Sequence, residues 1–363
     1  MVRPSAEFRQ AARPYLPVRV TDLAGLDLRT YAFDYDLTLA ILVLAPDGYV
    51  LHRYGGRDAR SPTGSLSMGS LVRFLRGALE SYRDYARRPR ARERRPPMRI
   101  EDIPAWAEKM AERRRRGRPL DCVHCHFVYD AYWEQGRRDG TWDDRRIWRF
   151  PPPARIGLVL DREEQELVRE VRAGSPAARA GLRPGDRLLR VGTQRILSHA
   201  DLSWVLENTP YQGAELSLRF LRAQRERGAT LRLEAGWRVG TPLEFSWRPS
   251  KWRLQPRPGF GGRDLRPEER AAFGLAADAF AFRITYLVTW GPMPRYGKAA
   301  VAAGIRKGDV VVGVDGAELE GHDHFHAWWR LTRRPGDTVV LRILRPRPGA
   351  EPERRTVRLR VLR

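Results

Sequence analysis

The stretch that decides the fold is SPAARAGLRPGDRLLRV, from Ser175 to Val191. A second version, KAAVAAGIRKGDVVVGV, occupies residues 298–314. Its glycines and its acidic residue recur at a constant spacing of 123 residues: Gly181, Gly185 and Asp186 match Gly304, Gly308 and Asp309. The match continues without a gap to Gly213 and Leu218 in the first copy and Gly336 and Leu341 in the second. The second half of the chain therefore contains one fold twice.

Each copy contains residues that are typical of helix starts and helix ends. Ser175 is placed to cap a short helix, with Pro176 at its first position and Gly181 ending it in a left-handed conformation. A tight turn at 183–186 then feeds a strand over 187–191. The pattern predicts a second helix, a strand and a returning strand in both copies. These are expected at 200–207, 215–221 and 230–234, and again at 324–331, 338–344 and 355–362.

The pattern S-P-A-A-x-A-G-L-x-x-G-D-x-[IL]-L resembles the bacterial, HtrA-type PDZ domain, over residues 152–236 and 266–363. The resemblance implies two PDZ domains that bind protein C-termini or extended peptides as an added strand, with backbone N–H groups holding the terminal carboxylate. The peptide-binding residues it implies are Ile156, Gly157, Leu158 and Val159 in the first copy and Phe273, Gly274 and Leu275 in the second. Alternatively, these apolar residues only fill the sheet.

The pattern of apolar and turn residues in 1–86 predicts a helix, a strand at 17–23, a hairpin at 37–55 and a closing helix at 70–82. This order resembles the later part of a thioredoxin fold, so we expect a partial thioredoxin-like α/β region that begins inside the fold. Leu37 stands where thioredoxins place a cis-proline. Thiol chemistry is therefore not expected in this region, and a binding or structural role is favoured.

The net charge of +23 invites a nucleic-acid interpretation, but only four of the 67 basic residues are lysines. Such arginine dominance is typical of a GC-rich genome. The densest runs, Arg87–Arg95 and Arg113–Arg118, fall in a basic linker and helix predicted at 87–120. Without stacking aromatics or a known reader fold beside them, they favour a solvated segment over specific nucleic-acid binding.

The only two cysteines lie in the segment 121–151, within DCVHCHFVYD at 121–130. C-x-x-C-H resembles the attachment motif of c-type cytochromes. The resemblance implies that Cys122 and Cys125 bind the porphyrin of one haem c and that His126 is the metal ligand. Met110, Met98, His52 and His124 are the candidates for a sixth ligand. A redox dithiol and a zinc-bound or inert cysteine knuckle remain alternatives.

A Trp/Pro-rich linker is predicted at 237–265, and no run is apolar enough to span a membrane. No protease or hydrolase motif is present, and the histidines of His322–His326 do not share a helical face. The arrangement resembles modular envelope proteins of planctomycete-like bacteria.

We therefore predict a multidomain α+β chain acting as a non-enzymatic scaffold with one haem for electron transfer or redox sensing, and a possible redox partner. The alternatives are a thiol-disulfide oxidoreductase and a pure interaction protein. Haem attachment would require export to the periplasm or cell envelope, although no signal peptide is visible and the start may be truncated.

Overall fold

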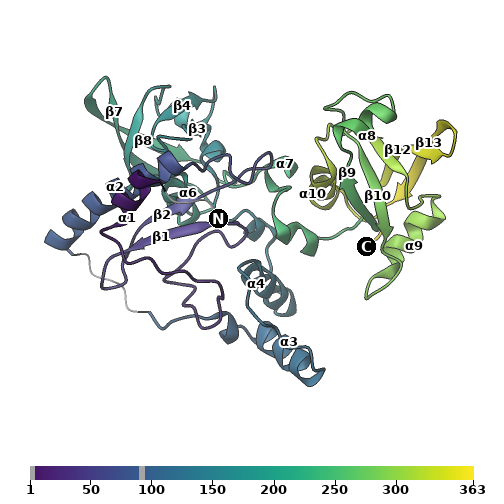
Figure 1. The fold of residues 1–363 in the computed structure, drawn as a ribbon, viewed down its shortest axis with the longest axis horizontal. Coiled ribbons are helices and arrows are strands. Elements are labelled where there is room, and N and C mark those ends of the chain that lie inside the picture. Colours follow the sequence, from purple (N-terminus) through teal and green to yellow (C-terminus); the bar gives the residue numbers. More distant parts are fainter. Residues whose placement is uncertain (1–4, 90–94) are drawn as a thin grey trace. The chain divides into compact units, whose positions relative to one another are not determined.

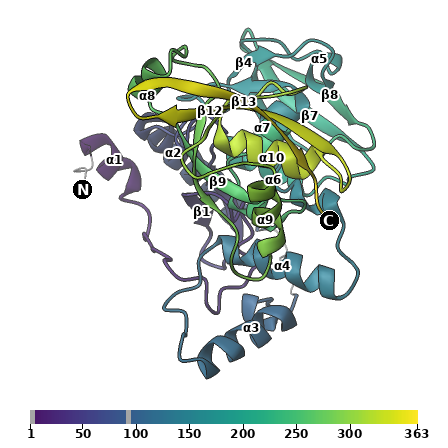
Figure 2. The ribbon, with the colours of Figure 1, turned by 90° about the vertical axis from the view of Figure 1, so that its right-hand side faces the viewer.

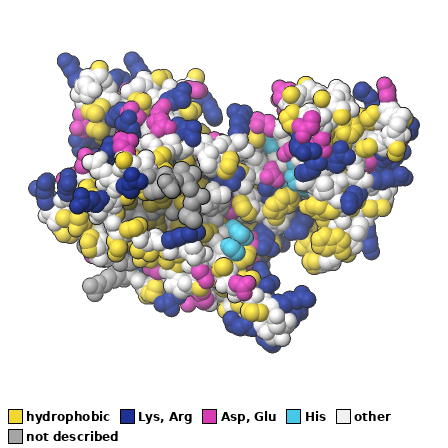
Figure 3. Space-filling model, viewed as in Figure 1, with side chains coloured by type: hydrophobic (Ala, Val, Ile, Leu, Met, Phe, Trp, Pro, Cys, Tyr) yellow, Lys and Arg dark blue, Asp and Glu magenta, His cyan; other side chains and the backbone are white. Residues whose placement is uncertain are grey.

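The computed structural model describes residues 5–89 and 95–363, and the chain divides into two compact units, Met1–Gly240 and Thr241–Arg363 (Figure 1). Each unit mixes helices and strands. Among the described residues, no helix has the length and apolar character needed to cross a membrane. The space-filling view shows Lys and Arg side chains spread over the visible face of both units and intermixed with Asp and Glu (Figure 3).

The first unit begins with a helix, a hairpin and a long helix. These are α1 (Ala6–Ala12), β1 (Ala40–Leu44), β2 (Val50–Gly55) and α2 (Met68–Arg87). The hairpin and both helices confirm the expected order, but no strand forms at 17–23, where Val18 and Val20 are exposed. The β1–β2 sheet has two strands, so the further strand that the thioredoxin resemblance requires is missing from it. That part of the prediction was wrong.

The cysteine segment packs against the loop that precedes β1. It contains α4 (His126–Arg138), and the preceding segment, predicted as a basic linker and helix, contains η1 (Ile100–Asp102) and α3 (Pro104–Arg115). The Leu23 N–H donates to the Val123 carbonyl at 3.0 Å, and the Val123 N–H donates to Asp22 Oδ1 at 2.9 Å. Trp106 and Val128 are buried in the same cluster as Leu23. Residues 90–94 of the basic run at 87–95 lie outside the described residues.

The first copy of the repeat completes this unit. Its elements are η3 (Pro153–Ile156), β3 (Leu158–Leu160), β4 (Val168–Val171), α5 (Pro176–Arg179), β5 (Arg187–Val191), β6 (Gln194–Arg195), α6 (His199–Glu207), β7 (Ala214–Arg222) and β8 (Arg225–Leu233). β3 pairs with β4, and a second sheet has the order β6-β5-β7-β8. Ser175 Oγ accepts from the Ala178 N–H, and Gly181 has a φ of 79°, so both predicted helix signals are confirmed.

Strand β2 docks onto α6 through buried polar contacts. Asp201 is fully buried, and its carboxylate accepts from His52 Nδ1 at 2.8 Å and from the Arg53 N–H at 2.9 Å. The Arg53 guanidinium lies 3.6 Å from the centre of the Trp204 ring. Burial lowers the pKa of Arg53 to about 10. The N-terminal region and the first repeat therefore share one packed body instead of forming independent domains.

The second unit contains the second copy and the segment before it. Its elements are α7 (Pro242–Phe245), η4 (Pro249–Arg253), β9 (Phe260–Asp264), α8 (Pro267–Ala272), β10 (Phe282–Leu287), α9 (Pro294–Ala302), β11 (Val310–Val314), α10 (His322–Thr332), β12 (Thr338–Arg347) and β13 (Ala350–Arg360). One sheet has the order β13-β12-β11-β10-β9, and its long β12–β13 hairpin is prominent in Figure 2. Phe260, Phe325 and Trp329 fill the core between sheet and α10.

Most of the predicted 237–265 linker belongs to this unit, because Phe245, Lys251 and Leu254 are buried in it.

An ion pair occurs at the same place in both copies. Asp186 accepts from the Arg183 N–H at 2.8 Å and from Arg222 Nε at 2.7 Å. Asp309 accepts from the Arg306 N–H at 2.8 Å and from Arg345 Nε at 2.8 Å. Each arginine also donates to the carbonyl of the helix-ending glycine, Gly181 or Gly304. The G-D dipeptide therefore joins the turn after the first helix to a distant strand.

Candidate functional site

The two copies present equivalent strands at the edge of a sheet, β3 in the first and β9 in the second. Each strand follows a glycine in the left-handed region, Gly157 with φ 85° and Gly259 with φ 86°. The carbonyl of each glycine accepts a backbone N–H at 2.8 Å, from Arg172 or Val288. Leu158 pairs with Val171 in the same register in which Phe260 pairs with Leu287. These matches identify β9 as the second copy of β3.

The structure corrects the position predicted for the second peptide-binding strand. Phe273, Gly274 and Leu275 lie in the turn that ends α8, and Phe273 and Leu275 pack on a small cluster with Leu265. They come after β9 and before β10, because the second copy inserts α8 between these two strands. The equivalent run is Pro258-Gly259-Phe260-Gly261, which the sequence interpretation assigned to a linker.

The residues predicted for the first copy divide into core and surface. Ile156 and Leu158 are buried in the core with Leu202 and Leu206 of α6. A Cβ at Gly157 would lie 2.1 Å from the Ser175 Cβ, so the glycine is required by close approach as well as by its φ. Val159 is 47% exposed. Of the four residues, Val159 is therefore the one that presents its side chain at the surface.

The edge of β9 that faces α10 already has a hydrogen bond to a side chain. The Gly262 N–H donates to His322 Nε2 at 3.0 Å, and the His322 N–H donates to Asp264 Oδ1 at 2.7 Å. His322 is the first residue of α10, which lies beside β9 (Figure 1). A peptide strand that used the Gly262 N–H would have to displace this imidazole.

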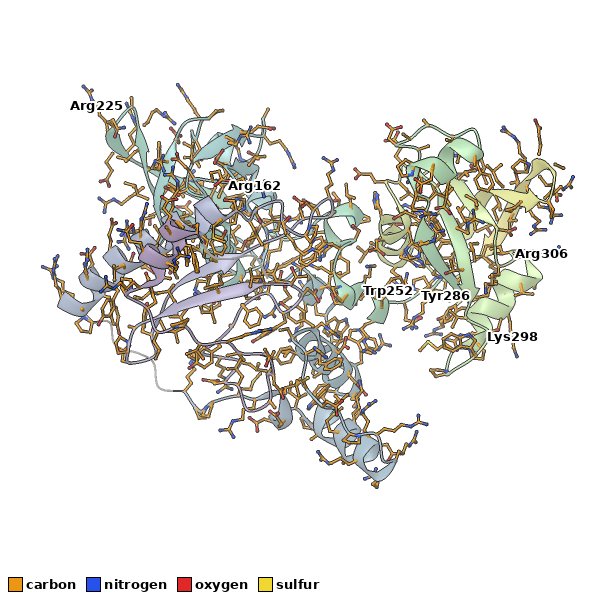
Figure 4. The ribbon with its side chains drawn as sticks, in the orientation of Figure 1. Arg162, Arg225, Trp252, Tyr286, Lys298 and Arg306 are labelled. Carbon is orange, nitrogen blue, oxygen red and sulfur yellow. The ribbon has the colours of Figure 1, made fainter. Side chains whose placement is uncertain are left out.

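An aromatic residue seven positions before each left-handed glycine lies on the neighbouring helix. In the first copy, Phe150 stacks on Trp204 with ring centres 6.2 Å apart, and its N–H donates to Glu207 Oε2 at 2.8 Å. In the second copy, the Trp252 ring lies 4.8 Å from that of His326. Figure 4 labels Trp252 in η4 and Tyr286 on β10. We call the segments 148–153 and 249–258 the straps.

The helix residue beside each strap carries opposite charge in the two copies. Glu207 pairs with Arg149 at 2.8 Å and with Arg238. The residue at the same place in the repeat is Arg330, whose guanidinium lies 5.0 Å from the centre of the Trp252 ring and bonds His326 Nδ1 at 2.8 Å. Burial lowers the pKa of Arg330 to about 9. Sequence reasoning missed both residues, although the constant spacing of the repeat aligns them.

Models of the PDZ domain match residues 167–218 and 291–361, so the chain contains two PDZ domains. Among matching solved structures is an HtrA-type protease, AlgW, determined with a decapeptide, at 15% identity and a TM-score of 0.25. The match covers 54% of this chain and 54% of that one, so the chain spans about half the length of that protease. No curated protein matches the chain.

The C-x-x-C-H motif lies at the start of α4. Cys125 directly precedes the helix, and His126 is its first residue. Both thiols are free and half-buried, and burial raises the pKa of Cys125, which opposes thiolate formation. The His126 ring stacks on His124 with centres 5.9 Å apart.

The structure shows where the residues predicted as candidates for a sixth haem ligand lie. His52 is excluded, because its Nδ1 bonds Asp201 and its Nε2 bonds Ser81 Oγ, each at 2.8 Å. Met98 and Met110 lie against the same cluster as Cys125. Within residues 5–89 and 95–363, no three His, Cys, Asp or Glu side chains gather as a metal site. On α10, the rings of His322 and His326 lie with their centres 4.4 Å apart, so these two do share a helical face, contrary to the sequence expectation, whereas His324 bonds the Glu320 N–H.

Proposed function

We propose that the chain is a peptide-binding scaffold whose two PDZ domains hold protein C-termini or extended peptides along β3 and β9. The observation that supports this most strongly is the equivalent construction of the two edges. Each has a left-handed glycine, an edge strand and a helix beside it. An added strand gains main-chain hydrogen bonds at such an edge, and N–H groups near the glycine would receive the terminal carboxylate.

Binding by the full chain tests this function. Fluorescein-labelled heptapeptides with random last four residues and a free C-terminus would be measured by fluorescence polarisation. We expect binders whose amidated forms lose affinity by about tenfold or more, because a charge-assisted hydrogen bond is lost. The absence of any binder would contradict the proposal, and equal affinity for free and amidated peptides would contradict recognition of C-termini and leave only binding of extended peptides.

A matched pair of variants localises binding to the first domain. Val159→Arg changes an exposed side chain on β3, and Val301→Arg changes a similarly exposed side chain on α9. A peptide that binds along β3 should lose affinity with the first variant and retain it with the second. Identical behaviour of both variants would show that β3 is not its binding site.

Haem attachment remains a separate proposal, supported by the position of His126 at the start of α4. Cys122 and Cys125 would hold the haem, His126 would coordinate iron, and the group would supply one-electron transfer. Expression with cytochrome c maturation machinery, a denaturing gel, haem stain and a pyridine spectrum test it, with Cys125→Ser as control. A periplasmic or envelope location depends on the same result. Thiols that instead cycle against glutathione would favour the oxidoreductase alternative.

A further inference from the structure

Arg330 is a buried cation, and Asp323, the carboxylate whose charge raises the pKa of Arg330, is already paired with Lys251. It is 7% exposed, and its guanidinium contacts are to His326 and to the Trp252 ring. Among the described residues, no carboxylate pairs with it, and its Nε has no hydrogen-bond partner. An isolated buried charge is costly, so such groups are normally paired. The position therefore calls for an anion from outside the chain.

The first copy shows what a completed version of this position looks like. Glu207 occupies the place of Arg330 in the repeat, and Arg149 of the strap and Arg238 neutralise it. The strap backbone also donates to it, through the Phe150 N–H. In the second copy the strap contributes Lys251 and Trp252, but Lys251 pairs with Asp323 at 3.3 Å. The charge of Glu207 on α6 is therefore neutralised within the chain, whereas the charge of Arg330 on α10 has no paired carboxylate among the described residues.

A second arginine increases this excess next to the loop that begins β9. Arg257 lies two residues before Gly259, and its Nη2 donates to the Trp252 carbonyl at 3.0 Å. Burial lowers the pKa of Arg257, and its positive charge also lowers the pKa of Arg330. No described carboxylate pairs with Arg257 either. Two guanidinium groups without a paired carboxylate, both beside Trp252 of the strap, match a ligand with two negative charges.

We propose that the second PDZ domain selects peptides with an acidic side chain close to the C-terminus, and that Arg330 binds this side-chain carboxylate. The inference rests on the proposed function, which already assigns the terminal carboxylate to N–H groups of the loop before β9. Arg330 then supplies the site for the second negative group. Its planar guanidinium can take a carboxylate through two parallel hydrogen bonds.

The test uses the full chain and pairs of fluorescein-labelled heptapeptides ending in valine. Each pair carries Glu or Gln at one of the three residues before the valine, with either a free or an amidated C-terminus. We expect the wild-type chain to prefer Glu at one position by about tenfold or more, as hydrogen bonds to charged groups predict. Arg330→Gln should reduce that preference below about twofold. Arg334→Gln, an exposed charge just beyond the same helix, should leave it unchanged.

Other results of this binding experiment would contradict either the inference or the proposed function. Equal affinity for Glu and Gln peptides in the wild-type chain, or a preference that survives Arg330→Gln, overturns the inference but leaves peptide binding intact. A loss of binding confined to free C-termini in Arg330→Gln would show that Arg330 binds the terminal carboxylate, contrary to the proposal. If no free-carboxylate peptide binds the wild-type chain, the proposed function itself fails.

A second measurement separates binding from folding. Because the guanidinium is uncompensated, Arg330→Gln should not lower the melting temperature, whereas a structural arginine would lower it when replaced. Arg330→Lys keeps the charge without the planar fork, so we expect part of the preference for Glu to remain. A destabilised Arg330→Gln together with an unchanged preference in Arg330→Lys would contradict the assigned role.

Discussion

At the scale of single residues, the repeat preserves an ion pair that ties a turn to a strand. Asp186 and Asp309 are each 1% exposed, and each takes two hydrogen bonds from one arginine and one from a backbone N–H. Removing one partner of a buried pair leaves an unpaired charge and an unmet donor. The G-D dipeptide is therefore a structural feature of both PDZ domains.

We expect Asp309→Asn to lower the free energy of unfolding by about 2–4 kcal/mol, because Arg345 would keep a partly buried charge without a partner. Urea denaturation measures this. Asp315→Asn is the control, since the Asp315–Arg342 pair is exposed and should change stability by less than about 1 kcal/mol. Similar decreases in the free energy of unfolding for the two variants would show that burial does not determine how much the Asp309–Arg345 pair stabilises the protein.

A second prediction concerns the imidazole on the edge of β9. His322→Ala would free the Gly262 N–H, so we expect a peptide bound along β9 to gain about two- to tenfold in affinity, the value of one hydrogen bond. His324→Ala, on the same helix, should have no such effect, because that ring bonds the Glu320 N–H. Weaker binding in His322→Ala would mean that the imidazole contacts the peptide instead of competing with it.

At the scale of elements, each PDZ helix contains a histidine held neutral by burial. Burial lowers the pKa of His199 on α6 to about 4 and the pKa of His326 on α10 well below its usual value. An unfolded histidine titrates near pH 6.5, so the unfolded chain binds more protons than the folded chain below that pH. Stability contributed by these neutral histidines is lost as the pH falls from about 6.5 toward 4.

We expect the free energy of unfolding to be lower at about pH 5 than at about pH 7.5, measured by urea denaturation. The double variant His199→Gln and His326→Gln should show a flatter pH profile, because it removes two groups that bind protons in the unfolded chain but stay neutral in the folded chain. A profile that is equally steep in the double variant would assign the acid sensitivity to other groups.

At the scale of the whole molecule, the units do not follow the boundaries that the repeat predicts. A fragment beginning at 266 would lack α7 with the buried Phe245, the strap with the buried Lys251, and β9. We expect residues 241–363 to unfold cooperatively as an isolated fragment and residues 266–363 to be far less stable. Circular dichroism melting curves compare them, and equal melting temperatures would show that β9 and the strap contribute little.

The repeat allowed most of the PDZ elements to be predicted, because helix caps and turn glycines act locally. Strand β5 and helix α6 are examples, with Arg187–Val191 and His199–Glu207 close to expectation. The second edge strand could not be located this way, since Gly157 and Gly259 are only 102 residues apart and α8 interrupts the constant spacing of 123. Burial of Arg330 depends on the strap, whose packing no local pattern encodes.

The most direct test of the account is hydrogen–deuterium exchange of the full chain with and without the tightest heptapeptide of the Glu series. We expect slower exchange at 258–263 and along α10 when the peptide is bound, because an added strand would pair with β9 beside that helix. Protection elsewhere in the chain, with β9 and α10 exchanging at unchanged rates, would contradict it.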